Sequence, residues 1–85
     1  MPNVYWSDEA RATQDELPER VRHAIEERVA YIRQFPEMYP VIESGRYRGY
    51  RRMPVLRRYL VFYRTFGPNG SAFVRAIVHA RSDLR

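Results

Sequence analysis

The stretch RYRGYRRMPVLRRYLVFY, residues 46–63, combines a dense series of arginines with a run that a sheet should bury. Residues 57–64 are rich in β-branched and aromatic types, contain no Gly or Pro, and have the usual length of one strand. We therefore predict that this run is the central strand of a small sheet. Removing a guanidinium from water without a partner is costly, so the arginines before this strand, at positions 46, 48, 51 and 52, should line a face that meets solvent or an anionic partner.

The chain has 85 residues, which is enough for one domain with a single modest core, and we expect residues 1–85 to form it. It contains no cysteine, which excludes disulfides and thiolate metal sites, and its two separated histidines do not make a metal site. No segment resembles a signal peptide or approaches the roughly 20 apolar residues that span a bilayer. We expect a cytoplasmic protein that uses no metal or other cofactor and no membrane.

All fifteen basic residues are arginines, and they are unevenly distributed. Residues 1–45 have five arginines against nine acids, a net charge of −4, whereas residues 46–85 have ten arginines against one acid, a net charge of +9. So basic a C-terminal half indicates a polyanion or an acidic protein as partner, because binding would release counterions and relieve self-repulsion. The alternative is an arginine-rich codon bias on a solvated face, although bias alone would spread arginine evenly.

The N-terminal half predicts one strand followed by two helices. Residues 4–6 are β-prone, and Ser7 follows as a candidate N-cap before two acidic residues. A first helix should cover 8–17 and a second 18–35. The second helix has four apolar residues at spacings of four, four and three, namely Val21, Ile25, Val29 and Ile32. This apolar face should pack on the sheet.

The C-terminal half predicts three strands. Residues 47–53 should form a strand with a bulge or edge position at Gly49, and Pro54 should end it. The sequence Gly-Pro-Asn-Gly at 67–70 predicts a turn, so the central strand and residues 71–79 should form an antiparallel hairpin. The expected fold class is α+β, with two N-terminal helices packed on one face of a small antiparallel sheet in the order β-α-α-β-β-β.

Side chains alternate between two faces along the last predicted strand. The small apolar residues should face the helices: Ala72, Val74, Ala76 and Val78. The opposite face should hold Phe73, Arg75, Ile77 and His79. We expect the arginines that precede the central strand to join this opposite face, where they would form a concave basic surface: Arg46, Arg48, Arg51 and Arg52. Leu60 and Phe62 of the central strand are expected there too.

Five motifs follow one another along nearly the whole chain. They are Trp6-Ser7-Asp8-Glu9-Ala10, Phe35-Pro36-Glu37, Tyr50-Arg51-Arg52-Met53-Pro54-Val55, Arg58-Tyr59-Leu60-Val61-Phe62-Tyr63-Arg64 and Val78-His79-Ala80-Arg81-Ser82-Asp83-Leu84. In this order the chain resembles the RelE/ParE superfamily of bacterial type II toxins. The resemblance implies a toxin with an acidic or amphipathic cognate antitoxin, whose C-terminal segment lies over the toxin as a helix in a groove or as an added strand.

The superfamily divides into ribosome-dependent mRNA endonucleases similar to RelE and inhibitors of DNA gyrase similar to ParE. The short helical hairpin resembles RelE, whereas the amino-acid sequences of residues 59–64 and 79–84 resemble those of ParE and the plasmid-stabilisation proteins. The nucleases commonly carry an arginine where this chain has Leu60. Of two basic positions on their second strand, Arg51 matches one and Met53 occupies the other. The resemblance favours gyrase as target, with mRNA cleavage second and a non-toxic nucleic-acid-binding module third.

The candidate site residues form three groups. If the chain is a nuclease, His79 would be the acid or base and Arg75 and Arg81 would stabilise phosphate charge; the plain alternative makes His79 a hydrogen-bonded residue at a strand end. The candidates for target or nucleic-acid binding are Arg46, Tyr47, Arg48, Tyr50, Arg51, Arg52, Arg57 and Arg58. The candidates for antitoxin binding would form an apolar patch on the face of the sheet away from the helices, which we call the apolar floor: Leu60, Phe62, Phe73 and Ile77.

Overall fold

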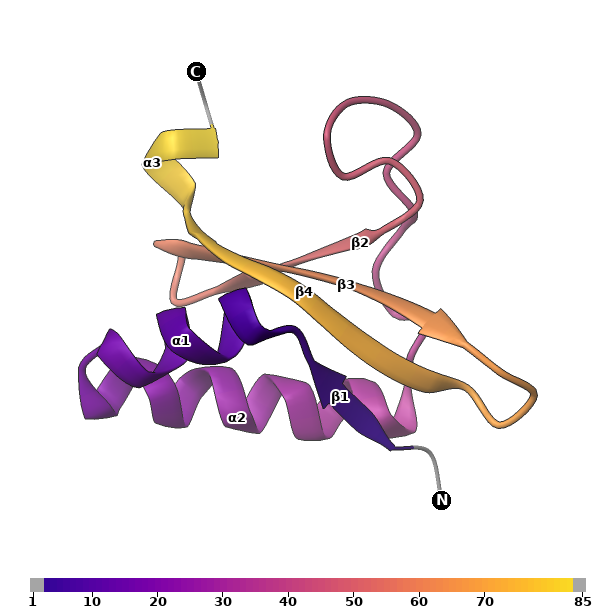
Figure 1. Ribbon diagram of the computed structural model, residues 1–85, viewed down its shortest axis with the longest axis horizontal. Coiled ribbons are helices and arrows are strands. Elements are labelled where there is room, and N and C mark those ends of the chain that lie inside the picture. The colour runs from indigo at the N-terminus through magenta and orange to yellow at the C-terminus, as the bar shows by residue number, and fades with distance from the viewer. Residues whose placement is uncertain (1–2, 84–85) are drawn as a thin grey trace.

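The computed structural model describes residues 3–83, with two helices covering one face of a four-stranded sheet (Figure 1). The elements in chain order are β1 (Val4–Trp6), α1 (Asp8–Glu16), α2 (Glu19–Gln34), β2 (Arg51–Val55), β3 (Tyr59–Phe66), β4 (Ser71–His79) and α3 (Ala80–Asp83). The long connection from α2 to β2 rises to the other side of the sheet, where α3 also lies (Figure 1). The predicted α+β class and element order are confirmed.

The strands lie in the order β1-β4-β3-β2, so β3 is an interior strand as predicted. β2 pairs antiparallel with β3, and β3 pairs antiparallel with β4 across the predicted turn. β1 pairs parallel with β4, so the sheet is mixed. The order brings the N-terminal strand beside the last strand of the chain, and this pairing places the start of α1 against β4.

Both predicted helices form, with ends within one or two residues of the expected positions. Ser7 is the N-cap of α1, and its side chain accepts a hydrogen bond from the Ala10 amide at 2.9 Å. The predicted face of α2 is buried through Val21, Ile25, Val29 and Ile32. These side chains form one hydrophobic core with residues of β2, β3 and β4. The helical periodicity of the sequence therefore identified the contribution of α2 to this core.

The boundaries of two predicted strands are wrong. Residues 47–50 form turns, and β2 begins only at Arg51 and continues through Pro54. Proline is tolerated in β2 because this is an edge strand, where a missing amide donor costs little. The central strand begins at Tyr59, since Leu56 and Arg57 have φ values of 54° and 58° and turn the chain between β2 and β3.

A β-bulge at Arg75 reverses the predicted alternation of β4. Phe62 pairs with Ala76, but the next residue, Tyr63, pairs with Val74, so Arg75 is the extra residue. Beyond the bulge every side chain changes face relative to a regular strand. Ile77 therefore lies in the core beneath the helices, with 7% of its surface exposed. We call the side of the sheet away from α1 and α2 the open face. The prediction that Ala76 and Val78 would face the helices, with Ile77 on the open face, is wrong.

Candidate target-binding surface

The connection between α2 and β2 is folded by its own backbone hydrogen bonds. The Ile42 amide donates to the Tyr50 carbonyl at 2.7 Å, and the Gly49 amide donates to the Ile42 carbonyl at 2.9 Å. Gly45 and Gly49 have φ values of 90° and 88°, which residues with a side chain rarely adopt. The result is a defined loop that exposes Arg46 and Arg48, as the prediction of a basic surface requires.

Aromatic and arginine side chains of this loop stack on the open face of the sheet. The Tyr47 ring lies parallel to Phe62, with 3.9 Å between centroids and 9° between planes, and Phe62 is only 2% exposed. The Arg46 guanidinium lies over the Tyr47 ring at 5.5 Å from its centroid. The rings of Tyr47 and Tyr50 meet edge to face. The Arg64 guanidinium lies over the Tyr50 ring, 5.6 Å from its centroid. Both tyrosines predicted to stack on bases thus already stack within the protein.

Arg51 does not belong to this open face. It pairs with Tyr63 in the sheet and donates a hydrogen bond to the Tyr39 carbonyl, while the Tyr63 hydroxyl donates to the Pro36 carbonyl at 3.0 Å. Burial raises the pKa of Tyr63 above its ordinary value of 10.0, although the nearby Arg51 charge acts in the opposite direction. Arg51 therefore holds the segment after α2 against the sheet. Arg52, one residue further, is exposed.

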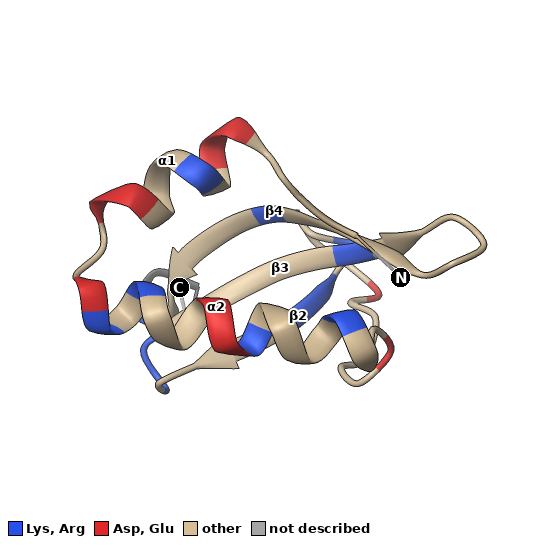
Figure 2. Cartoon of the chain, turned by 90° about the horizontal axis from the view of Figure 1, so that it is seen from below, with Lys and Arg blue, Asp and Glu red and all other residues tan. Residues whose placement is uncertain are grey.

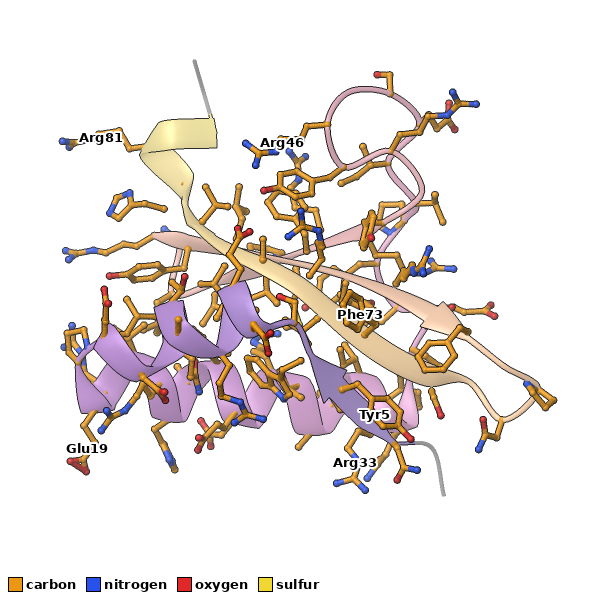
Figure 3. The ribbon with its side chains drawn as sticks, in the orientation of Figure 1. Tyr5, Glu19, Arg33, Arg46, Phe73 and Arg81 are labelled. Atoms are coloured by element: carbon orange, nitrogen blue, oxygen red, sulfur yellow. The ribbon has the colours of Figure 1, made fainter. Side chains whose placement is uncertain are left out.

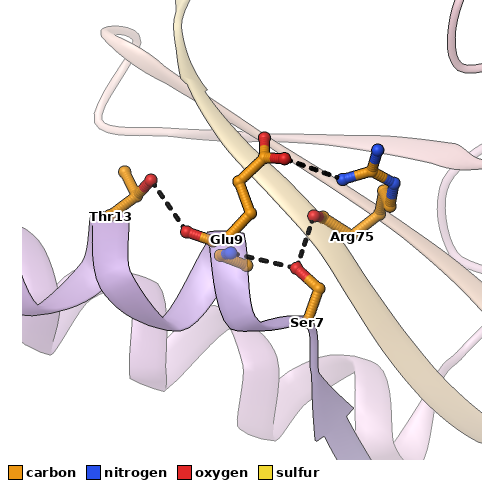
Figure 4. A network of polar contacts seen from close by, with 5 residues as sticks. Ser7, Glu9, Thr13 and Arg75 are labelled. Atoms are coloured by element: carbon orange, nitrogen blue, oxygen red, sulfur yellow. Dashed lines mark hydrogen bonds and ion pairs between the residues drawn. The ribbon is translucent and has the colours of Figure 1, made fainter.

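Arg75 is engaged with the start of α1 (Figure 4). Its guanidinium is 3.1 Å from a carboxylate oxygen of Glu9, and the hydrogen bond to this carboxylate raises the pKa of Arg75. The Ser7 hydroxyl donates to the Arg75 carbonyl at 2.7 Å while it caps α1. Figure 2 shows the acidic residues at the two ends of α1 and the basic position on β4 beneath this helix. Arg75 therefore links β4 to the start of α1, and its role in stabilising phosphate charge stays a prediction.

A second group of arginines meets at the end of the sheet, where the β2–β3 turn lies beside α3. The Arg58 amide donates to the Val55 carbonyl at 3.2 Å, and the Arg58 carbonyl accepts from the Ala80 amide at 2.7 Å. These bonds hold the turn against the end of β4. An open depression of about 540 Å³ lies here, lined by Arg57, Arg58, His79, Ala80 and Arg81. We call these five residues the basic corner.

His79 is the exposed histidine of the basic corner. Its ring meets Tyr59 edge-on, with 5.3 Å between centroids and 68° between planes. Its Nδ1 atom accepts a hydrogen bond from the Arg81 amide at 3.3 Å. This agrees with the plain alternative of a strand-end histidine bonded to a neighbour. The structure brings together two members of the predicted catalytic set, His79 and Arg81, but leaves the third, Arg75, with Glu9.

Only part of the predicted apolar floor is accessible. Leu60 and Phe73 are half-buried on the open face, Phe62 lies beneath Tyr47, and Ile77 belongs to the core. Among the described residues, exposed large apolar side chains also include Tyr5, which pairs with Phe73 in the sheet, and Tyr31, Phe35, Met38, Val41, Leu56 and Phe66.

An apolar hollow lies at the C-terminal end of α2. It has a volume of about 550 Å³ and is lined by Tyr31, Phe35, Pro36, Glu37 and Met38. The rings of Tyr31 and Phe35 are 5.5 Å apart. A signal for this cluster was present in the sequence, because the two aromatic residues are spaced i, i+4 and lie off the buried face of α2.

Within residues 3–83, no group of three or more His, Cys, Asp or Glu side chains could hold a metal ion. In that same part of the chain, no helix is long and apolar enough to cross a membrane.

Comparison with known proteins connects this geometry to a family. Residues 4–84 match the family described as the ParE toxin of the type II toxin–antitoxin system parDE. No curated protein matches the chain.

Three solved structures share the fold. The intact E. coli RelBE toxin–antitoxin complex has a TM-score of 0.76 and 12% identity over 92% of this chain and 95% of that one. A YoeB/ParE toxin from Agrobacterium tumefaciens has a TM-score of 0.76 and 13% identity over 91% and 96%. The isolated E. coli RelE toxin has a TM-score of 0.77 and 13% identity over 99% and 95%. The family match covers almost the entire sequence, and the chain therefore belongs to the ParE toxins of type II toxin–antitoxin systems, with the RelE/ParE fold.

Proposed function

We propose that this type II toxin inhibits bacterial growth by acting on DNA gyrase, in the ParE-like mode. The observation that carries the choice of target is the state of Arg75. RNA cleavage through the 2′-hydroxyl requires an acid, a base and several cations around one phosphate. Arg75 is paired with Glu9 at 3.1 Å instead of facing the basic corner beside His79.

Leu60 supports the same choice. It pairs with Val78 in the row that includes Phe62 and Ala76, and this row lies on the face away from the helices. Leu60 thus lies on the open face of the sheet, where an arginine at this position could reach a bound phosphate. A leucine there supplies no hydrogen bond to a developing phosphorane, and loss of one such donor costs about 3 kcal/mol of transition-state stabilisation.

A RelE-like, ribosome-dependent mRNA endonuclease is the second candidate. The observation that favours it is the basic corner, where one histidine and three arginines line the same depression. Under this hypothesis His79 would transfer protons and Arg81 would stabilise phosphate charge. Replacing His79 with alanine should then abolish toxicity while the protein stays folded.

The proposed partner of the toxin is a cognate antitoxin with an acidic or amphipathic C-terminal segment. The net charge of +9 in residues 46–85 favours an acidic partner, and the neighbouring RelBE structure is itself a toxin–antitoxin complex. Leu60 and Phe73 are the candidate contacts on the open face. Such a toxin would act in the cytoplasm and serve plasmid stabilisation.

Expression of the gene without its antitoxin tests the proposal. We expect growth arrest accompanied by a DNA-damage response, with transcripts intact, because a gyrase block interferes with DNA topology. Cleaved transcripts, lost in the His79→Ala variant, would instead establish the nuclease. Unimpaired growth despite full expression of folded protein would favour a non-toxic binding module.

A further inference from the structure

We propose that the basic corner binds backbone phosphates of duplex DNA through Arg57, Arg58 and Arg81. This goes beyond the proposed function, because it concerns direct contact between the toxin and DNA whichever enzyme is the target. Figure 3 shows Arg81 projecting from α3 on the side of the sheet opposite α1 and α2, where the side chain of Arg46 also lies.

The backbone of the β2–β3 turn is the first observation. Two-residue turns with positive φ at both central positions strongly prefer sequences such as Asn-Gly. Here the positions are occupied by Leu56 and Arg57, with φ values of 54° and 58°. The bond that the Arg58 amide donates to Val55 and the bond that the Arg58 carbonyl accepts from Ala80 stabilise this unfavourable conformation. Strained non-glycine residues concentrate at functional sites, so we infer that the turn is kept for the position it gives its arginines.

The charge of the corner is the second observation. Arg57, Arg58 and Arg81 are all exposed, and none has an ion-pair partner among the side chains that the structure describes. This distinguishes them from Arg75, which is paired with Glu9. Three cations around one open depression repel one another until an anion occupies it. Guanidinium groups are suited to phosphate because their forked donors can bind two oxygens at once.

The histidine of the corner adds a directed donor. Because Nδ1 of His79 accepts from the Arg81 amide at 3.3 Å, the ring proton of the neutral form resides on Nε2. Nε2 can therefore donate to a phosphate oxygen held by the neighbouring arginines. The corner thus offers hydrogen-bond donors of two kinds around one depression of about 540 Å³.

The aromatic residues favour duplex DNA over single-stranded RNA. Proteins bind single strands largely by stacking bases on open aromatic faces, whereas contact with a duplex backbone requires only donors to phosphate. Tyr47 has Phe62 on its ring at 3.9 Å and the Arg46 guanidinium over it at 5.5 Å. Arg64 lies over Tyr50, and Tyr59 packs against the His79 ring. Among the described residues, the rings of Tyr47, Tyr50 and Tyr59 thus each already contact another side chain.

Fluorescence anisotropy with a labelled DNA duplex, measured over a range of salt concentrations, tests the inference. The test protein is the full chain carrying three substitutions: Arg57→Gln, Arg58→Gln and Arg81→Gln. Its control loses the same charge from α2, on the helix side of the molecule: Arg20→Gln, Arg22→Gln and Arg33→Gln. Each phosphate contact contributes about 0.9 to the slope of log K against log salt, so the slope should fall by about 2.7 in the corner variant and by less than about 1 in the control.

Equal losses in the two variants would overturn the inference, because binding would then depend on net charge alone. So would absence of duplex binding by the unmodified protein at 50 mM salt, or a preference for single-stranded RNA. If the triple variant does not fold, Arg81→Gln, which leaves the strained turn intact, should lower the slope by about 0.9. No gyrase is present in this assay, so its failure would leave the proposed target untouched.

Discussion

The Ser7 hydroxyl joins α1 to the bulge of β4, and its removal is a demanding test of the fold. In the Ser7→Ala variant the Ala10 amide loses its cap at 2.9 Å and the Arg75 carbonyl loses its donor at 2.7 Å. Loss of an N-cap costs about 1 kcal/mol, and a typical intramolecular hydrogen bond contributes another 0.5–1.5 kcal/mol or so. We therefore expect the free energy of unfolding to fall by about 2 kcal/mol, or roughly 8–16 °C in Tm for a chain of this size.

Urea denaturation followed by circular dichroism measures this difference. Thr13→Ala is the matched control, because the Thr13 hydroxyl also bonds a carbonyl, that of Glu9 at 3.0 Å, but on the exposed side of α1. It should change stability by less than about 0.5 kcal/mol. Ser7→Thr, which retains a hydroxyl, should recover most of the loss. If Ser7→Ala is as stable as Thr13→Ala, the hydroxyl does not join the helix to the bulge as we describe.

Two further changes test the core and its polar boundary. Ile25 is fully buried, so Ile25→Ala should cost about 2–5 kcal/mol in urea denaturation, against less than about 0.5 kcal/mol for the exposed Glu27→Ala; equal losses would contradict the packing of α2. The pKa of Tyr63 is raised in the folded state. The contribution of the Tyr63 hydroxyl to the free energy of unfolding is therefore complete below about pH 10, where the phenol is neutral in the unfolded chain as well. This contribution is lost as the pH rises through the folded-state pKa. The stability difference between wild type and Tyr63→Phe should therefore shrink above pH 10, and a constant difference would contradict it.

Local signals in the sequence identified most of the fold. The Ser7 cap and the spacing of Val21, Ile25, Val29 and Ile32 depend on neighbours within one or two helical turns, and both are confirmed. The limits of β4 are also as predicted, because Gly-Pro-Asn-Gly is a strong turn signal on one side of it. Such features need no information about the rest of the chain.

The errors arose where tertiary structure overrides the local pattern. Nothing in the alternation of β4 marks Arg75 as a bulge, because Ala76 and Ile77 are both apolar and either could have faced the core. The turn at Leu56 and Arg57 contains no glycine to mark it. The prediction from β propensity therefore began the central strand two residues too early. The loop residue Tyr47 is β-prone, but its ring stacks on Phe62 and its backbone turns.

The site depended most on contacts that are distant in sequence. Glu9 was not among the candidates, although it determines the state of Arg75, because 66 residues separate the two. The basic corner likewise required the pairing of β3 with β4, which brings Arg58 to Ala80. Arginine content alone could not distinguish the exposed Arg57 from Arg51, whose guanidinium bonds a backbone carbonyl.

Supercoiling of relaxed plasmid by purified DNA gyrase tests the proposed target most directly. Purified toxin should inhibit supercoiling, equimolar antitoxin should relieve the inhibition, and the same toxin preparation should leave mRNA intact on translating ribosomes. Unimpaired supercoiling together with efficient ribosome-dependent cleavage of mRNA would contradict the proposal.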